Sequence, residues 1–303
     1  MKTIKKIMLG LLAAPALLLV GCSSDDDATP QNGNLTLAIT NLEDLGTNAR
    51  YEGWLLVDGT PISTGTFSVD ASGVLSETSF SVATETLNDA TKFILTVEPN
   101  PDSDPAPSAQ KLIAGDFNGT TAAVSTSVAP AIGDFSSVAG SFFLRSPTDE
   151  PVGSVNNGND ESGVWFGLPG APPTPDFTLP TLPEGWVYEG WVVGETGPLS
   201  TGQFTAFDTV DLNAGASSSF SGTEQVGPPI PGEDFFNNAP TGETFPLDIR
   251  GRTVVISIEP SPDNSPAPFL LKPLAAVAGN DTAPATYSFN QNLGSFPTGT
   301  VTR

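Results

Sequence analysis

The feature that most constrains the fold of this 303-residue chain is an internal repeat. The segment Tyr51-Glu52-Gly53-Trp54 recurs 137 residues later as Tyr188-Glu189-Gly190-Trp191. The same offset relates Pro61, Ser63-Thr64-Gly65 and Phe67 to Pro198, Ser200-Thr201-Gly202 and Phe204. Agreement at this density indicates a duplication, so the chain is expected to hold two copies of one structural unit.

A second block repeats with a longer offset. Val97-Glu98-Pro99-Asn100-Pro101-Asp102 corresponds to Ile258-Glu259-Pro260-Ser261-Pro262-Asp263, 161 residues later. Pro105-Ala106-Pro107 and Lys111 likewise correspond to Pro266-Ala267-Pro268 and Lys272. The second copy therefore carries 24 extra residues between the two blocks. The proline-rich stretch 227–245 is the expected place for them, as a long surface loop.

Each copy is expected to form strands, because short apolar alternating segments are separated by turn residues. The chain holds 31 glycines and 29 prolines, and no long apolar stretch has helical periodicity after residue 20. The expected strands are 35–40, 51–57, 65–69, 74–82 and 93–97 in the first copy, and 177–181, 187–193, 202–207, 217–221 and 253–258 in the second. The sequence therefore predicts an all-β protein with two tandem Ig-like β-sandwich domains.

The domain boundaries follow from the repeat. The first β-sandwich is predicted at 34–168, a proline-rich linker at 169–176 and the second β-sandwich at 177–303. Residues 140–168 hold two apolar segments, Phe142-Phe143-Leu144 and Val164-Trp165-Phe166, around a Gly/Asn/Asp loop. We expect these segments to form a hairpin that completes the sheet of the first copy, with 169–175 as a stiff interdomain spacer.

The repeated motifs resemble the extracytoplasmic, C-terminal domain of anti-sigma-K factors. The residues that carry the resemblance are Gly53-Trp54, Asp58-Gly59-Thr60-Pro61, Gly65-Thr66-Phe67 and the segment 93–107. The family usually has Gly-Gly-Ser before its prolines, whereas this chain has Asn100 to Asp104. The resemblance covers about 60–80 residues of each copy. It implies a β-domain that senses or binds outside the cytoplasm, here present twice.

The N-terminus has the three parts of a bacterial lipoprotein signal peptide, predicted at 1–21. Three lysines precede an apolar run at 7–20, which is shorter than the roughly 20 residues needed to span a bilayer. The run ends in Leu19-Val20-Gly21-Cys22, which resembles a lipobox. Cys22, the one cysteine of the chain, is therefore the expected lipidation site, with acyl chains such as palmitate. The alternative is an ordinary secretory signal with a chance cysteine.

Residues 22–33 form an expected acidic tether, and Ser23-Ser24-Asp25-Asp26-Asp27 resembles a tag that directs lipoproteins to the outer cell surface. We therefore expect a cell outer membrane lipoprotein, lipid-anchored and surface-exposed. Typical anti-sigma-K factors carry a cytoplasmic helical domain that holds the sigma factor and one membrane-spanning helix. Neither pattern occurs in this sequence, so we expect no sequestration of a sigma factor.

The charge excludes one class of partner. The chain has 34 acidic and 11 basic residues, and removal of 1–21 takes three lysines, which leaves a net charge of −26. Such a chain is repelled by nucleic acid, so DNA or RNA binding is not expected. The expected partners are the membrane, through the N-terminal lipid, and a protein or a glycan of the envelope.

No enzyme is expected. Histidine is absent and the one cysteine is assigned to the lipid, which removes the common nucleophilic and acid–base sites and zinc sites. Glu98 and Glu259, each at the end of an apolar strand, are the remaining candidate acid pair. The preferred interpretation is structural, with each glutamate accepting N–H groups of the proline-rich turn that follows. Asp102-Ser103-Asp104 and 156–161 lack a defined calcium-ligand spacing, so neither a metal nor a cofactor is expected.

Trp54 and Trp191 are candidate binding residues, since an exposed indole can stack on a sugar. The preferred interpretation places both in the core. Two functions from different classes remain open. One is a non-enzymatic binding or sensing module like the outer domain of anti-sigma-K factors. The other is a surface carbohydrate- or polymer-binding accessory lipoprotein, which exposed tryptophans would favour.

Overall fold

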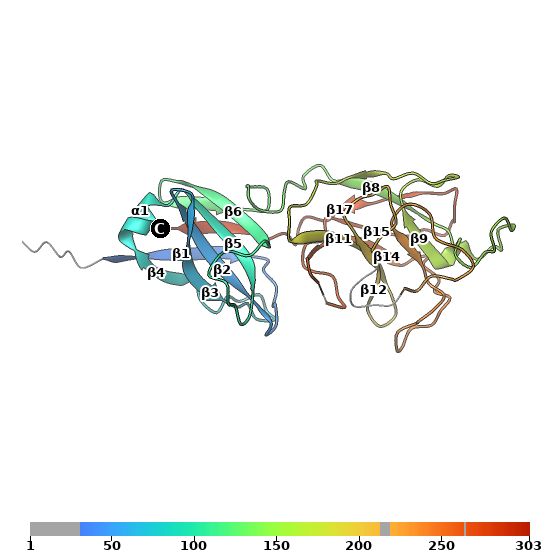
Figure 1. Ribbon diagram of the computed structural model, residues 1–303, viewed down its shortest axis with the longest axis horizontal. Coiled ribbons are helices and arrows are strands. Elements are labelled where there is room, and N and C mark those ends of the chain that lie inside the picture. The colour runs from blue at the N-terminus through green and yellow to red at the C-terminus, as the bar shows by residue number, and fades with distance from the viewer. Residues whose placement is uncertain (1–30, 213–218, 264) are drawn as a thin grey trace, which may run out of the picture. The chain divides into compact units, whose positions relative to one another are not determined.

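The computed structural model describes residues 31–212, 219–263 and 265–303, and these residues are almost entirely β-structure (Figure 1). Residues 32–303 form one compact unit in which the paired strands run antiparallel. The predicted all-β class with sandwich-like packing is confirmed. In the described ranges, no helix is long and apolar enough to cross a membrane.

The first sheet has eight strands in the order β3-β2-β5-β6-β7-β18-β1-β4. Its strands are β1 (Asn32–Thr40), β2 (Ala49–Val57), β3 (Thr60–Phe67), β4 (Ser79–Ala83), β5 (Lys92–Pro99), β6 (Lys111–Asn118), β7 (Thr121–Val124) and β18 (Thr298–Thr302). The short helix α1 (Thr84–Asp89) connects β4 to β5. Phe67 on β3 and Phe80 on β4 have ring centroids 6.1 Å apart, so the two ends of the strand order face each other. The sheet thus folds back over its own core, and we call it the first module.

Apolar periodicity explains these strands. On β1, Leu35, Leu37 and Ile39 are buried and alternate with exposed neighbours, as expected of a strand with one face on the core. The central strand β5 has six consecutive buried residues, 93–98, so both of its faces are covered. Pro99 ends β5, in agreement with the expectation that proline does not continue a central strand.

The second module is built from two further sheets. One has the order β12-β11-β14-β15-β17, with β11 (Trp186–Val193), β12 (Pro198–Phe204), β14 (Thr253–Pro260), β15 (Leu274–Val277) and β17 (Asn290–Gln291). The other has the order β10-β8-β9-β13 with β16 beside β8, and contains β8 (Ala139–Leu144), the 3-10 turn η1 (Asp160–Ser162), β9 (Gly163–Phe166), β10 (Phe177–Thr178), β13 (Gly232–Asp234) and β16 (Tyr287–Ser288). Phe166 on β9 and Phe204 on β12 pack 6.1 Å apart, which joins the two sheets face to face.

The hairpin predicted at 140–168 exists as β8 and β9, but its assignment to the first copy is wrong. Phe142 of β8 pairs with Phe166 of β9, and β8 also pairs with β10 and β16, while β9 pairs with β13. The side chains of β8 and β9 also pack on the second module, since Phe142 contacts Phe289 and Phe166 contacts Phe204. Alternation identifies a hairpin, but it does not identify the sheet that the hairpin joins.

The C-terminal strand is also placed differently from the prediction. The range 177–303 assigns residues 298–302 to the second copy, whereas β18 lies in the first sheet between β1 and β7. Val301 is fully buried there. Arg303 strengthens the placement, because its guanidinium lies 4.4 Å from the ring centroid of Phe117 and donates to the carbonyl of Gly119 at 3.1 Å. Strand pairing thus crosses the predicted boundary between the copies.

Two connecting segments differ from their predicted forms. The stretch 227–245 is not a simple surface loop, because it contains β13 and the buried side chains of Ile230 and Phe235. Residues 169–173 form a loop closed by the backbone pair Leu168 and Thr174, whose two N–H···O distances are 2.8 and 3.1 Å, whereas the sequence predicts a stiff spacer. Extra residues in the second module therefore add core rather than only surface.

The repeated blocks occupy matching places in the two modules. In the first, β2 pairs with β3 and β5; in the second, β11 pairs with β12 and β14. A β-bulge interrupts the first pairing between Gly53 and Trp54 and the second between Gly190 and Trp191. The hydroxyl of Tyr51 donates to the carbonyl of Glu43, and that of Tyr188 to the carbonyl of Pro180, each eight residues earlier.

Candidate functional site

The candidate site of the first module is a cavity of about 400 Å³ beside the glycine–tryptophan bulge of β2. We call it the first pocket; it is lined by Glu52, Trp54, Ser63, Asp102, Ser103, Asp104 and Pro105. The bulge depends on Gly53, since a Cβ there would lie 2.5 Å from Thr64 Oγ1 and 3.0 Å from the ring of Phe93. Both repeated blocks therefore contribute to this pocket, one through β2 and β3 and the other through the proline-rich loop after β5.

A buried chain of hydrogen bonds connects the tryptophan to the proline-rich loop. Trp54 Nε1 donates to Thr96 Oγ1 at 2.9 Å, and Thr96 Oγ1 donates to Glu98 Oε1 at 2.5 Å. The same oxygen of Glu98 accepts the backbone N–H of Ser108 at 2.9 Å. The indole, the hydroxyl and the carboxylate thus fix the loop that follows β5 against the sheet.

Glu52 is one of the residues that line the first pocket. The residue is 8% exposed, and its Oε1 accepts the hydroxyl of Ser63. Burial raises the pKa of Glu52, the Ser63 hydrogen bond opposes this, and the charges of Glu98 and Asp102 raise it further. The pocket thus contains a desolvated carboxylate with other acids nearby.

The second module has a corresponding cavity of about 440 Å³, which we call the second pocket. It is lined by Trp191, Thr196, Gly197, Pro198, Leu199, Ser200, Phe220, Pro240, Ser265, Pro266 and Ala267. Trp191 Nε1 donates to Ser257 Oγ at 2.7 Å, Ser257 donates to Glu259, and Glu259 accepts the N–H of Phe269 at 3.0 Å. The hydrogen-bond chain of the first module is therefore repeated with serine in place of threonine.

In the second module, the carboxylates of Glu189 and Glu259 have hydrogen-bond partners on both oxygens. Glu189, which corresponds to Glu52, accepts Ser200 Oγ on Oε1 and Gln203 Nε2 on Oε2 at 3.1 Å. Burial raises the pKa of Glu189 to about 7 and that of Glu259 to about 8, against the Ser200 and Ser257 hydrogen bonds, which lower them. Both groups therefore lie in the interior as hydrogen-bond acceptors.

The predicted candidate residues Trp54, Trp191, Glu98 and Glu259 are all buried. Trp54 and Trp191 are each 2% exposed, so neither indole offers the open face that stacking on a sugar needs. Glu98 and Glu259 are 2% and 0% exposed and accept the N–H groups that the sequence analysis expects. Cys22 lies outside the described residues.

The structure brings Glu98 and Glu259 to one cleft of about 610 Å³, which also contains Glu43 and Asp263. The sequence predicts the two glutamates in separate domains, so their presence in one cleft differs from the prediction. Each carboxylate is nevertheless occupied by a hydroxyl and a backbone N–H of its own module. Their burial leaves no accessible pair of carboxyl groups flanking a substrate bond, which acid–base hydrolysis needs.

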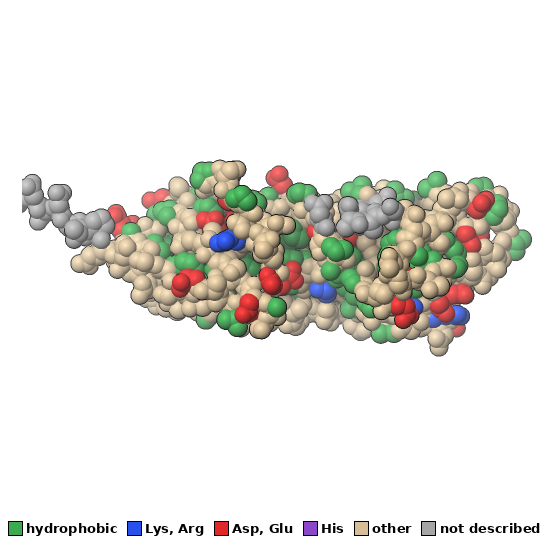
Figure 2. All heavy atoms as spheres, turned by 90° about the horizontal axis from the view of Figure 1, so that it is seen from below, with side chains coloured by type: hydrophobic (Ala, Val, Ile, Leu, Met, Phe, Trp, Pro, Cys, Tyr) green, Lys and Arg blue, Asp and Glu red, His purple; other side chains and the backbone are tan. Residues whose placement is uncertain are grey.

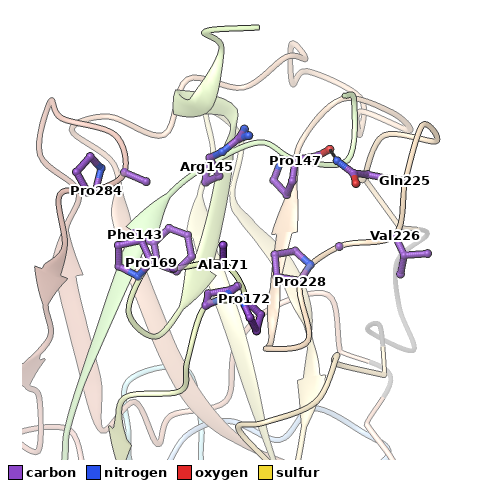
Figure 3. A pocket seen from close by; sticks show the side chains of 14 residues that line it. Phe143, Arg145, Pro147, Pro169, Ala171, Pro172, Gln225, Val226, Pro228 and Pro284 are labelled. Carbon is purple, nitrogen blue, oxygen red and sulfur yellow. Dashed lines mark hydrogen bonds between the residues drawn. The ribbon is translucent and has the colours of Figure 1, made fainter. Parts of the chain in front are cut away.

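A further pocket of about 530 Å³ belongs to the second module and is shown in Figure 3. Proline rings of several loops line it, together with Phe143 and Arg145 (Figure 3). Arg145 is already paired, because its guanidinium lies 2.6 Å from both Glu150 and Asp160. The pocket is therefore apolar, with a neutralised charge at its edge and no free acid, base or nucleophile among its lining residues.

The two segments weighed for calcium are internally bonded. Asp102 Oδ1 accepts the N–H of Asp104, and Asp104 Oδ1 accepts the N–H of Ala106. In 156–161, Asp160 is paired with Arg145. Among the described residues, no group of three or more histidine, cysteine, aspartate or glutamate side chains is arranged to hold a metal ion.

The first pocket could have been found from the repeat itself. Glu52, Ser63, Asp102 and Pro105 have identical counterparts at Glu189, Ser200, Asp263 and Pro266. Residues shared by both copies surround the pocket, whereas much of the remaining sequence has diverged. These residues establish the repeat in the sequence, but their convergence in space depends on strand pairings that the repeat does not show.

Comparison with known proteins gives one family. The family described as anti-sigma-K factor rskA, C-terminal, matches residues 9–111, about a third of the chain. The match includes β1 to β5 and reaches the first residue of β6, so it contains every residue that lines the first pocket. The chain is thus similar to that family over most of the first module. Neither the curated proteins nor the solved structures contain a match.

Proposed function

We propose that this chain is a non-catalytic, lipid-anchored binding or sensing module of the bacterial cell envelope. The observation that carries the proposal is the similarity of residues 9–111 to the C-terminal domain of anti-sigma-K factors. In the proposal, the first module is the outer β-domain of that family and the second module is a further copy. Matching bulges, strand pairings and buried Trp–hydroxyl–Glu chains support the second part.

Burial of the candidate acids and tryptophans supports a binding role over the alternatives. Glu98 and Glu259 serve as interior acceptors, which argues against an enzyme that would use them. The buried indoles of Trp54 and Trp191 argue against a carbohydrate-binding lipoprotein that would stack sugars on them. The lining of the first pocket offers recognition groups but no paired acid and base in one accessible place.

Anchoring is the second part of the proposal. We place a lipid on Cys22 and the modules outside the cytoplasm, at the outer membrane, with the acidic tether between lipid and β-structure. A strongly acidic chain suits this position, because it is repelled by anionic lipid head groups and extends away from them. Acidic side chains also outnumber basic ones on the face shown in Figure 2.

The test has two measurements. Full-length protein and its Cys22→Ser variant are fed a clickable palmitate analogue and fractionated; the wild type is expected to be labelled and membrane-bound, and the variant is expected to be neither. The secreted Cys22→Ser protein is then added to envelopes from cells that lack the protein. We expect saturable binding of a fluorescently tagged sample, and an excess of the same protein without the tag should compete with it. An unlabelled, cytosolic wild type would overturn the anchoring, and non-saturable binding would overturn the binding role.

A further inference from the structure

The first and the last strand of the compact unit are neighbours in the first module. β1 begins at Asn32, and β18 ends at Thr302. The two strands are antiparallel, and their register places Thr36 opposite Thr302 and Thr40 opposite Thr298. The start of β1 and the end of β18 therefore lie at the same end of the first sheet. We call this end the anchor end, because the N-terminal tether joins β1 there.

Both connections to the second module leave the first module at the opposite end of these strands. The chain passes from β7 to β8 through residues 125–138 and returns from β17 to β18 through residues 292–297. Val124, the last residue of β7, lies opposite Gly299, and the last residue of β1, Thr40, lies opposite the first residue of β18. A pull between the tether and the second module therefore draws β1 toward the anchor end and β18 toward the opposite end.

This arrangement loads the contacts between β1 and β18 in shear. When antiparallel strands are pulled in opposite directions along their axes, all residue pairs between them carry the load together and must break together. When the strands are pulled apart from one end, the pairs break one after another. Five residue pairs join β1 to β18, and five join β1 to β4 on its other side. β1 can therefore slide only if both rows of pairs give way.

Side chains also oppose the sliding of β1. Three apolar side chains of this strand lie in the hydrophobic core, those of Leu35, Leu37 and Ile39. A shift of the strand by one residue would turn all three to the outer face of the sheet. Beyond the end of β1, Asn41 Nδ2 donates to the carbonyls of Gly294 and Phe296 at 3.1 and 3.2 Å. β1 is thus also bonded to the segment that leads into β18.

Arg303 holds the end of β18 in place at the anchor end. Its guanidinium donates to the carbonyls of Leu87 and Ala90, at and just after the helix α1. It also donates to the carbonyl of Gly119 at 3.1 Å and lies 4.4 Å from the ring centroid of Phe117. A pull on β18 toward the second module must break these contacts together with the strand pairs. The side chain of Arg303 therefore retains β18 against such a pull.

We propose that the first module is a tension-bearing clamp between the lipid anchor and the second module, with β1 and β18 loaded in shear. The inference rests on the proposed function, because tension arises only when a membrane holds residue 22 and a partner pulls on the second module. It goes beyond that function by giving the first module a mechanical task. The chain then stays folded while a partner bound to the second module is drawn away from the membrane.

The test compares two directions of pull on the same chain in optical tweezers. The chain from residue 22, made without residues 1–21, offers the thiol of Cys22 for one DNA handle. The second handle is attached through Asn292→Cys, an exposed position in the segment before β18, or through a cysteine appended after Arg303. The first pair of handles loads β1 and β18 in shear, and the second pair peels them apart from the anchor end.

The expected result is a difference in the force that opens the first module. At one pulling rate this force should be about threefold higher in shear than in peeling, because five residue pairs break together rather than singly. The length of chain released in each event identifies the module that opens. Equal forces in the two directions, or a lower force in shear, would overturn the clamp.

Two arginine variants test the retaining side chain. Arg303→Ala is expected to lower the shear force by about a third, because the guanidinium contacts no longer share the load. Arg252→Ala is the matched control, since that guanidinium bonds Glu195 within the second module, and it should leave the shear force unchanged. An unchanged shear force in Arg303→Ala would overturn the role given to Arg303.

These force measurements need neither the lipid nor a partner, so they are independent of the tests of the proposed function. If the wild type carries the lipid and binds envelopes but the two forces are equal, the proposed function stands and the clamp fails. If the shear force is higher but Cys22 carries no lipid, the anchoring fails, and with it the place of the clamp between membrane and partner.

Discussion

The first and second modules place the same buried network in different electrostatic surroundings. Each has a tryptophan that donates to a hydroxyl, which donates to a glutamate that also accepts a backbone N–H of the proline-rich loop. In the second module Gln203 completes the coordination of Glu189, and the adjacent pocket is uncharged. In the first, Glu52 keeps an open acceptor and acids line the pocket. The comparison separates what the fold needs from what is available for recognition.

The largest expected effect comes from removal of residues 298–303. β18 lies between β1 and β7, and Val301 is fully buried, so its loss opens the first sheet in the middle. We expect the Trp54 indole resonance to collapse to a random-coil position while that of Trp191 stays dispersed. If the Trp54 and Trp191 resonances both move to random-coil positions, the two modules unfold as one cooperative unit.

Cutting the buried network should destabilise both modules by similar amounts. Thr96→Val and Ser257→Ala each remove the hydroxyl that joins an indole N–H to a glutamate, which leaves both partners in a dry interior. A cost of about 2–3 kcal/mol is expected for each. Chemical denaturation followed at each indole measures it, and a large cost in one module only would break the proposed equivalence.

The pH dependence of stability should be steeper in the second module. Burial raises the pKa of Glu259 to about 8 and of Glu189 to about 7 in the folded chain, against 4.5 as the ordinary value. Folding favours the protonated forms of both glutamates. Their contribution to the free energy of unfolding is therefore fully present below pH 4.5 and is lost as pH rises through 7 to 8. We expect the second module to be more stable at pH 5 than at pH 8.5 by about 2 kcal/mol.

Glu259→Gln is the control for that profile. The amide keeps the shape but cannot ionise, so the loss of stability of the second module between pH 5 and 8.5 should become smaller. Thermal unfolding at both pH values measures the difference. A profile as steep in the variant as in the wild type would show that Glu259 is not a source of the dependence.

The smallest expected effect comes from exchanging the residue that distinguishes the two carboxylates. Thr66→Gln gives the first module the counterpart of Gln203 and should occupy Glu52 Oε2, with a stabilisation of about 0.5–1 kcal/mol. Gln203→Ala should remove a similar amount from the second module. Denaturant midpoints measure both changes.

Much of the fold could be predicted because the repeat and the alternation of apolar residues are local signals. The strands around Trp54 and Trp191, the hairpin of β8 and β9, and the N–H groups accepted by Glu98 and Glu259 all follow from short segments. The sheet that this hairpin joins and the return of β18 to the first sheet could not be predicted from short segments. Both depend on pairings between distant residues, for which a single sequence offers no local cue.

The candidate site was predicted only in part for the same reason. Trp54 and Glu98 were identified from the sequence, and both are buried and stabilise the loop that forms the pocket wall, as their preferred structural interpretation expects. Glu52 and Asp102 were visible as repeated residues. Their convergence depends on the bulge at Gly53 and on the course of the proline-rich loop, which sequence patterns do not describe.

The position of β18 has a consequence for the order of events during synthesis. A ribosome makes the chain from residue 1 onwards, so β1 and β7 exist long before the strand that joins them. Throughout that interval both strands have an unpaired edge, and the first module is incomplete. The second module can close first, and β18, which is made after it, then completes the first module. Premature termination anywhere in the second half would therefore disable the part of the molecule furthest from the break in sequence.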